Sequence, residues 1–227
     1  MELAQISLTL RRFSKGRCNL SVTASTVLDI ARTLLNDDVG SLWTDSSLFP
    51  KLRQAHRELQ AKLKASAAPV MRTIVNDLVV NAGVTSLSAI ADLLEPIKLY
   101  EKLTTDPATG YVQMTESDPL PIVAPSSSLI NWQWTMEQIL FNTATTNRHV
   151  KMLYWRSLPL PSVNSDVVGF LNAELYLAPR TAALASAAVG EEARHDSLTS
   201  AAMMSINEVI IANRGRAQPV QKETKRP

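Results

Sequence analysis

Residues 177–197 read LAPRTAALASAAVGEEARHDS, and two different structures are compatible with this stretch. The first part is a run of small side chains, as in a helix that packs closely against its neighbours. The second part contains Glu192 and His195, which stand three residues apart, the spacing that four-helix di-iron proteins use on metal-binding helices. The choice between the two decides whether the chain is organised around a metal centre or around helix packing.

The rest of the chain does not supply the other half of a di-iron site. Such a site needs a second Glu-x-x-His and two more glutamates. Neither His56 nor His149 has a glutamate three residues before it. The polar residues around His195 instead indicate a solvent-exposed helix start after Gly190, because acidic side chains favour the first turn of a helix. We therefore expect neither a metal nor another cofactor.

The alanines of this stretch predict close helix packing. Their small side chains leave a smooth helix surface on nearly all sides, so two neighbouring helices can approach. The neighbours could belong to one compact helical layer or to other copies in an oligomer, and the sequence does not choose between these. The alanines are Ala178, Ala182, Ala183, Ala185, Ala187 and Ala188.

Composition indicates an ordinary globular protein. Of 227 residues, 45% are hydrophobic and 19% are charged. The lone Cys18 excludes an internal disulfide and fits a reducing, intracellular environment. We expect no secretory signal and no membrane span. No G-x-S-x-G, P-loop or dinucleotide motif occurs, so the sequence indicates no enzyme class. A Ser-His-Asp arrangement drawn from distant positions leaves no such signature and stays open.

The charge is distributed unevenly. Residues 1–20 and 214–227 are both basic, so the body between them is acidic although the whole chain has a net charge of +2. Such ends are typical of tails that contact a partner, or of solvated, unstructured termini. The candidate partner contacts in the C-terminal tail are Arg214, Arg216, Lys222, Lys225 and Arg226.

Helical patterns occur at both ends of the body. Apolar spacing predicts a helix over Ser25–Leu35 and a second one that opens at Trp43-Thr44-Asp45, with Thr44 as N-cap. Ser165 and Asp166 are predicted to cap a third helix, which Pro179 interrupts or kinks. A last helix follows Gly190 and ends near Asn213, with one apolar face. That face comprises Leu198, Ala202, Ile206, Val209, Ile210 and Asn213.

The middle of the chain, about residues 77–157, has strand character. Asn131–Glu137 alternates, with Trp132, Trp134 and Met136 on one face. His149–Arg156 alternates too, and we predict that the two strands form a hairpin. Aromatic residues on paired strands favour a local core or a subunit contact over a nucleic-acid platform. The candidate subunit-interface residues are Trp43, Trp132, Trp134 and Trp155.

These elements predict an α+β fold that is mainly α. The expected architecture is a helical bundle with a small antiparallel β section inserted between N-terminal and C-terminal helix pairs, at about 25–73 and 165–213. The expected organisation is an N-terminal arm (1–20), one domain (21–213) and a basic C-terminal tail (214–227).

Across about residues 27–213, this order of elements resembles the head–tail connector (adaptor or neck) proteins of tailed bacteriophages. The similarity lies in spacing and not in an invariant catalytic motif. The stretches that carry it are Leu34–Asp38, Trp43–Pro50, Ala55–Leu59, Asn131–Trp134, Glu137–Phe141, Val150–Tyr154, Leu177–Ala185 and Val189–Glu191.

The resemblance implies a structural virion protein without enzymatic activity. Its expected form is a dodecameric homo-oligomeric ring at the neck, assembled in the host cytoplasm, that docks on the portal protein and contacts other neck or tail proteins. It would join capsid to tail and line part of the channel through which genomic DNA passes at ejection, without sequence-specific binding. The acidic body agrees with such a conduit, because favourable phosphate contacts would slow the DNA.

Two other classes of protein remain as alternatives. A DNA-binding regulator could use the basic helix Lys51–Lys64 together with the basic arms. A helical metal-binding enzyme, the less favoured alternative, would use Glu192 and His195.

Overall fold

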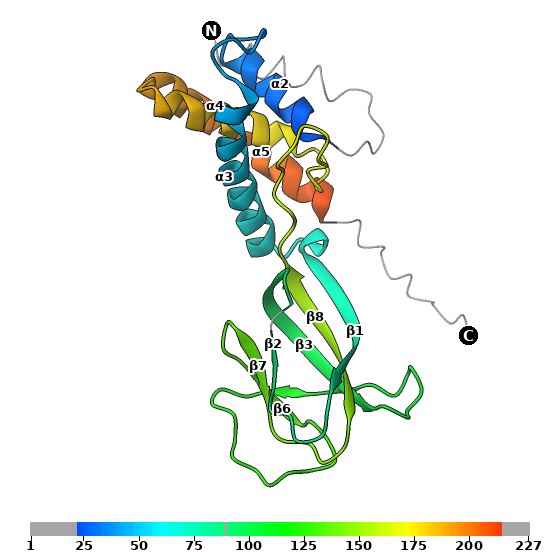
Figure 1. Ribbon diagram of the computed structural model, residues 1–227. Coiled ribbons are helices and arrows are strands. Elements are labelled where there is room, and N and C mark those ends of the chain that lie inside the picture. The colour runs from blue at the N-terminus through cyan, green and yellow to red at the C-terminus, as the bar shows by residue number, and fades with distance from the viewer. Residues whose placement is uncertain (1–21, 89, 215–227) are drawn as a thin grey trace, which may run out of the picture. The chain divides into compact units, whose positions relative to one another are not determined.

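The structure is a computed structural model that describes residues 22–88 and 90–214. The chain divides into two compact units (Figure 1). The helical unit combines the chain up to Val70 with the chain from Pro159 on, and the β unit is Met71–Leu158. The predicted N-terminal arm and all of the basic tail except Arg214 lie outside the described residues.

The predicted architecture is wrong, although the α+β class is right. The described residues form four α-helices and two four-stranded sheets, and 38% of these residues are helical and 25% are in strands. The β section is therefore no small insert in a helical bundle. The prediction failed because several strands are too short, or too irregular in apolar pattern, to be recognised from period-two alternation.

The helical unit is built around its third helix. Helix α4 packs against α2, α3 and α5. The last of these, α5, starts after Gly190 as predicted, and its predicted inward face is buried apart from the half-buried Ile210. The bounds are Ala24–Leu34 for α2, Asp45–Ala65 for α3, Glu174–Ala188 for α4 and Glu192–Asn213 for α5.

Small side chains let α4 occupy this position. Ala178, Ala182, Ala183 and Ala185 are all fully buried within the single chain. Close approach of the helices removes these methyl groups and the neighbouring backbone from water and brings atoms into van der Waals contact. The alanines before Ala187 therefore pack inside one subunit, which decides between the two alternatives that the sequence left open.

The predicted start of the third helix is wrong. Residues 165–173 are irregular, with a bridge from Val167 to Thr23, and α4 begins only at Glu174. The Asp166 carboxylate, expected to cap a helix, accepts hydrogen bonds from the backbone N–H groups of Ser162 (2.7 Å) and Val163 (3.0 Å). It closes a turn because these amides precede it in the chain, whereas a helix cap would accept from amides that follow.

Pro179 lies inside α4 and does not interrupt it. A proline has no N–H, so the carbonyl of Leu175, four residues earlier, lacks its usual helical donor. The hydroxyl of Ser205 on α5 donates to that carbonyl instead, at 2.7 Å. The neighbouring helix thus satisfies the acceptor that the proline leaves open, and α4 continues to Ala188.

Thr44 occupies the N-cap position of α3, but its side chain does not cap the helix. Its hydroxyl pairs with the Ser46 hydroxyl at 2.9 Å. The predicted capping hydrogen bond is therefore wrong, although the predicted start of the helix is right.

The β unit contains two sheets of four strands. The first has the order β1-β8-β3-β4, with all neighbours antiparallel, and the second has the order β2-β7-β6-β5, in which β5 and β6 are parallel. The bounds are Arg72–Val80 (β1), Ser86–Ser88 (β2), Leu93–Leu103 (β3), Val112–Gln113 (β4), Thr115–Glu116 (β5), Asn131–Trp134 (β6), Gln138–Phe141 (β7) and Arg148–Arg156 (β8).

The predicted hairpin between Asn131–Glu137 and His149–Arg156 is wrong. Strand β6 pairs with β7, where Trp132 lies opposite Phe141, while β8 lies between β1 and β3 in the other sheet. The chain turns back at Thr135, whose N–H donates to the Gln138 carbonyl. Met136 is consequently in a turn with φ of +68° and is 83% exposed, so it does not share a face with Trp132.

The inner faces of the two sheets enclose the core of the β unit. Val150 and Met152 on β8 are fully buried, as their alternation predicted. They belong to one apolar cluster with Trp132, Ile139 and Phe141 of the second sheet. The other face of β8 consequently points away from the second sheet.

We expect overpacking of α4 to destabilise the helical unit. Replacing Ala182 by leucine should lower the free energy of unfolding by about 1–3 kcal/mol, because α4 has no space for a larger side chain there. Urea denaturation followed by circular dichroism measures the change. The matched control is Ala187→Leu on the exposed part of α4, which should change stability by less than about 0.5 kcal/mol. Equal effects of the two substitutions would contradict the close packing of α4.

Candidate functional site

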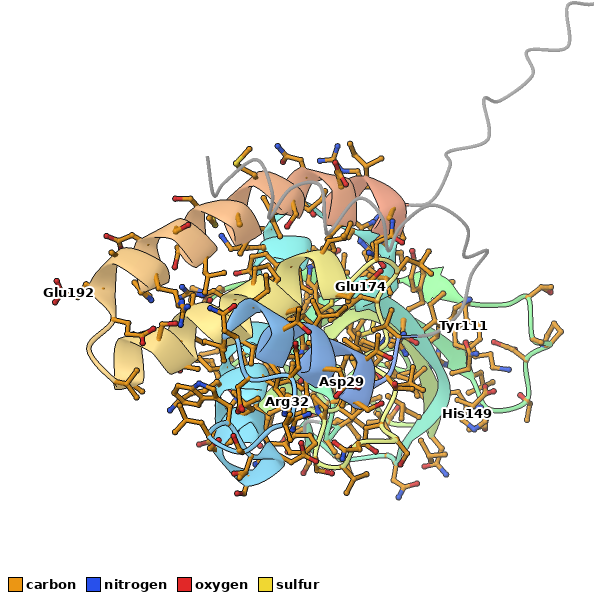
Figure 2. The ribbon with its side chains drawn as sticks, turned by 90° about the horizontal axis from the view of Figure 1, so that it is seen from above. Asp29, Arg32, Tyr111, His149, Glu174 and Glu192 are labelled. Atoms are coloured by element: carbon orange, nitrogen blue, oxygen red, sulfur yellow. The ribbon has the colours of Figure 1, made fainter. Side chains whose placement is uncertain are left out.

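Glu192 and His195 do not form part of a metal site in the described residues. Glu192 is exposed, and Figure 2 shows its side chain at the edge of the structure. His195 Nδ1 lies 3.0 Å from the Ala183 carbonyl oxygen, so this nitrogen carries a proton and ties α5 to α4. No three His, Cys, Asp or Glu side chains gather into a metal-binding group in the part of the chain described. None of its helices is both long and apolar enough to span a bilayer.

A polar network of the helical unit centres on Glu58 on α3. It accepts two hydrogen bonds from Arg180 on α4, at 2.6 Å from Nε and 3.1 Å from Nη2. Tyr176 donates to the same carboxylate at 3.4 Å, and Arg180 also donates to Thr199 on α5 at 3.2 Å. One paired charge therefore connects three helices.

These groups keep fixed protonation states at neutral pH. The hydrogen bond from Arg180 lowers the pKa of Glu58, and the same bond raises the pKa of Arg180. Burial, together with the charge of Glu58, raises the pKa of Tyr176 to about 12. None of the three is poised to exchange a proton near pH 7, so the geometry suits a structural connection and not general acid–base catalysis.

His56 is a second structural polar group, and it is fully buried on α3. Its Nε2 donates to the carbonyl oxygen of Val168 at 3.1 Å, and its Nδ1 accepts from Gln60 at 2.9 Å. Burial lowers its pKa, so the ring is neutral in the folded chain. It holds the segment before α4 against α3.

The loop between α2 and α3 is organised by Asp37. Its carboxylate accepts from the backbone N–H groups of Ser41 (3.0 Å), Leu42 (3.0 Å) and Trp43 (2.6 Å). These bonds, above all the one from Trp43, lower the pKa of Asp37. The tip of the loop exposes Val39 by 92% and Leu42 by 73%. Hydrogen bonds to Asp37 thus fix the conformation of the loop, and the loop exposes two apolar side chains.

Arg32 on α2 holds the other side of this loop. Its Nε donates to the Trp43 carbonyl oxygen at 3.0 Å, and its guanidinium pairs with Asp29 and Asp45. Figure 2 labels Arg32 and Asp29 on the same helix. Asn164 donates to Asp45 at 2.6 Å, which connects the loop to the segment before α4.

In the β unit a polar cluster forms at a bulge in β1. Asp77 has φ of +56° where the register shifts between Val75 and Leu78. It accepts from the Tyr111 hydroxyl at 2.6 Å, while Lys102 Nζ lies 3.8 Å away and His149 Nδ1 3.3 Å away. The Tyr111 bond lowers the pKa of Asp77. Figure 2 labels Tyr111 and His149, two residues of this cluster.

The predicted interface tryptophans occupy different environments. Trp43 and Trp132 are buried within their own units, at 9% and 1% exposure. Trp134 and Trp155 are half-buried, and the Arg72 guanidinium lies 4.5 Å from the Trp155 ring centroid. Their role at a subunit interface stays a prediction.

The predicted tail contacts are only partly described. Arg214 is exposed at the end of α5. The other four candidates, Arg216, Lys222, Lys225 and Arg226, lie outside the described residues.

Sequence reasoning missed the residues that hold these sites together. The pattern Asp37-x-x-x-Ser41 before a helix could have indicated a side-chain-closed turn, since aspartate bonds backbone amides that follow it. No local signal indicated that Glu58 would meet Arg180, because 122 residues separate them. Asp77 likewise depends on a bulge that only strand pairing creates.

The sequence matches the family described as SU10 adaptor protein over residues 22–222. The chain belongs to this family of phage head–tail adaptors, which confirms the resemblance found from the sequence. The family is one of structural proteins and suggests a virion component. No curated protein matches the chain.

We expect Glu58→Gln to destabilise the helical unit by about 1–2 kcal/mol, because Arg180 then loses its partner carboxylate in a half-buried position. Chemical denaturation at neutral pH measures the loss. Glu192→Gln, at an exposed position on α5, is the control and should cost less than about 0.5 kcal/mol. A Glu58→Gln variant as stable as the wild type would show that the network contributes nothing.

His56 should make the fold sensitive to mild acid. Its folded pKa is below the ordinary value of 6.5, so the unfolded chain takes up a proton that the folded chain refuses. The free energy of unfolding should fall as pH drops from 6.5 to about 5, and the slope should be shallower in His56→Gln. Denaturation curves across this range measure both slopes. His149 and His195 are unchanged in the variant, so identical slopes would contradict the assignment to His56.

Proposed function

We propose that this chain is the head-to-tail adaptor of a tailed phage. In this proposal it forms a homo-oligomeric ring, a dodecamer by resemblance to its family, that docks on the portal and joins the capsid to the tail. The observation that carries the proposal is the match to the adaptor family across residues 22–222, a range that includes all of the described residues.

The surface of the single chain supports an assembling protein. Large apolar side chains are exposed on several separate elements, including the tip of the Asp37 loop and the outer side of α5. On α5 these are Met203 (46% exposed), Met204 (79%) and Ile211 (70%). Met204 and Ile211 lie seven residues apart and so on one face of α5, where a single partner could cover both.

The charge distribution supports a DNA conduit. The body of the chain is acidic between basic ends. An acidic channel wall repels phosphate groups and so lets genomic DNA pass without being retained. In the proposed ring, the wall is formed by the body of each subunit, and the DNA is not bound by sequence.

The DNA-binding regulator receives less support. In the stretch Lys51–Lys64 of α3, Glu58 interrupts the basic face and pairs with Arg180, and Lys64 also has an interaction of its own. The face is therefore partly committed to structural contacts. Salt-sensitive binding of duplex DNA by the free chain would favour this alternative.

The proposed portal contact is the basic segment that begins at Arg214. Helix α5 ends in a fixed position, because the Asn213 side chain donates to the Leu171 carbonyl (2.9 Å) and accepts from the Leu171 N–H (3.1 Å). The segment that follows contains Arg214, Arg216, Lys222, Lys225 and Arg226 and has few apolar residues. Such a segment orders most readily against an acidic partner surface, where charge pairs compensate for the ordering entropy.

Electron microscopy of the purified chain, alone and mixed with the portal of the same virus, tests the assembly. The expected result is a ring seated on the portal, with or without rings of the free chain. A chain that neither forms rings nor binds the portal under any condition would overturn the proposed function.

We expect a chain that ends at Asn213 to bind the portal with an affinity at least about ten-fold lower, because five basic side chains are lost. Binding measured at low and high salt should show that the truncated chain is also less salt-dependent. A chain with the tail residues in scrambled order, and the same charge, is the control and should keep most of the affinity. Unchanged binding after truncation would remove the tail from the proposed interface.

A further inference from the structure

The loop between β5 and β6 presents an apolar segment to solvent. Residues 121–125 read PIVAP, and all five are exposed, with Ile122 fully so and Val123 by 50%. Two acidic side chains that precede the segment, Glu116 and Asp118, are exposed as well, as is Glu137 in the turn after β6. The segment is therefore apolar with acidic neighbours.

This apolar loop is held in place at both ends. Before it, Gln133 on β6 donates to Asp118 at 2.7 Å, and Asn142 donates to the Pro121 carbonyl oxygen at 2.6 Å. After it, Ser126 forms a bridge with Ala144 and accepts from the Thr145 N–H at 2.7 Å. A segment fixed in this way loses little conformational entropy when it binds, which favours its use as a docking element.

A second surface in the same unit has the opposite charge. It is the outer face of the β1-β8-β3 sheet, where Ile74 lies opposite Leu153 and Arg72 opposite Trp155. Ile74 is 51% exposed, and Val79 on the same strand is 54% exposed. Basic residues flank these apolar side chains. They are Arg72, Lys98, Lys151 and the half-buried His149, whereas the acidic residues on this face are Asp77, which already contacts Tyr111 and Lys102, and Glu95.

The two surfaces are not parts of one patch. The inner faces of the two sheets share the core of the β unit, so the outer face of β1-β8-β3 points away from the second sheet. The apolar loop is bound to the second sheet and to the segment after β7. A subunit therefore carries an acidic, apolar projection and a basic, apolar face at different places on one unit.

We propose that the apolar loop of one copy docks on the outer face of β1-β8-β3 of the next copy. The apolar side chains match and the flanking charges are opposite, which are the two properties that a specific contact needs. Because the contacting surfaces differ, the contact is heterologous, and repetition of a heterologous contact closes a ring when the rotation allows it. The inference rests on the proposed function, since it names the surfaces that would join neighbours in the proposed ring.

Complementation between two variants of the full chain tests this contact. Ile122→Asp places a charge on the loop and leaves the outer face intact, whereas Ile74→Glu does the reverse. Each alone should self-associate at least about ten-fold more weakly, because the isoleucine that the opposite apolar surface would cover is replaced by a carboxylate that loses its water on docking. Mixed together, they should form a one-to-one heterodimer that does not grow, since only one intact pair of surfaces remains. Native mass spectrometry and sedimentation velocity measure these species, with the portal present if the free chain is monomeric.

Two further variants keep the test decisive. Val84→Asp, on an exposed turn outside both surfaces, is the control and should assemble as the wild type does. Val79→Glu replaces Ile74→Glu if circular dichroism shows that the latter fails to fold. If the loop variant and the face variant each form rings as well as the wild-type chain does, this inference is overturned and the proposed function still stands. The same holds if Ile122→Asp assembles normally but loses the portal. A wild-type chain that forms no ring, with or without the portal, overturns both.

Discussion

The helical unit depends on the close approach that the small side chains of α4 allow. Four fully buried alanines bring α4 against three other helices, and larger residues in these positions would separate them. Close packing has a consequence for polar groups, because buried helices have little access to water. The carbonyl that Pro179 leaves without a donor is satisfied by Ser205, and the charge of Arg180 is satisfied by Glu58. Side chains of the neighbouring helices thus supply the hydrogen-bond partners that the polar groups of α4 lack within their own helix.

The β unit is organised in an equivalent way by β8. This strand has a neighbour on each side and supplies the centre of the core through alternate residues. Near its start, Arg148 forms a buried ion pair with Glu101 on β3. A buried pair of this kind contributes little net stability, because desolvation of both charges opposes their attraction. It does penalise other registers of β3 and β8, since a slipped strand would bury one of the charges without its partner.

The chemistry of the described residues agrees with the family to which the chain belongs. The groups with a shifted pKa include Tyr176, Glu58, Arg180 and His56, and each of these four makes contacts that join one element to another. Perturbed groups at a catalytic site would instead meet around a reacting centre. The features left without an internal role are exposed apolar side chains on held loops and on outer faces. In the proposed ring, neighbouring subunits and the portal would cover these surfaces.

The sequence by itself determined the α+β class, the positions of α2, α3 and α5, the inward face of β8 and the family. These follow from local periodicity and from spacing, which a single segment carries within itself. It also indicated the importance of the alanines but not whether they pack within one subunit. Only the tertiary structure decided that β6 pairs with β7, that α4 starts at Glu174 and continues past Pro179, and that Glu58 meets Arg180. Strand partners, a donor from Ser205 and an ion pair across 122 residues depend on groups far away in the chain, and no local pattern records them.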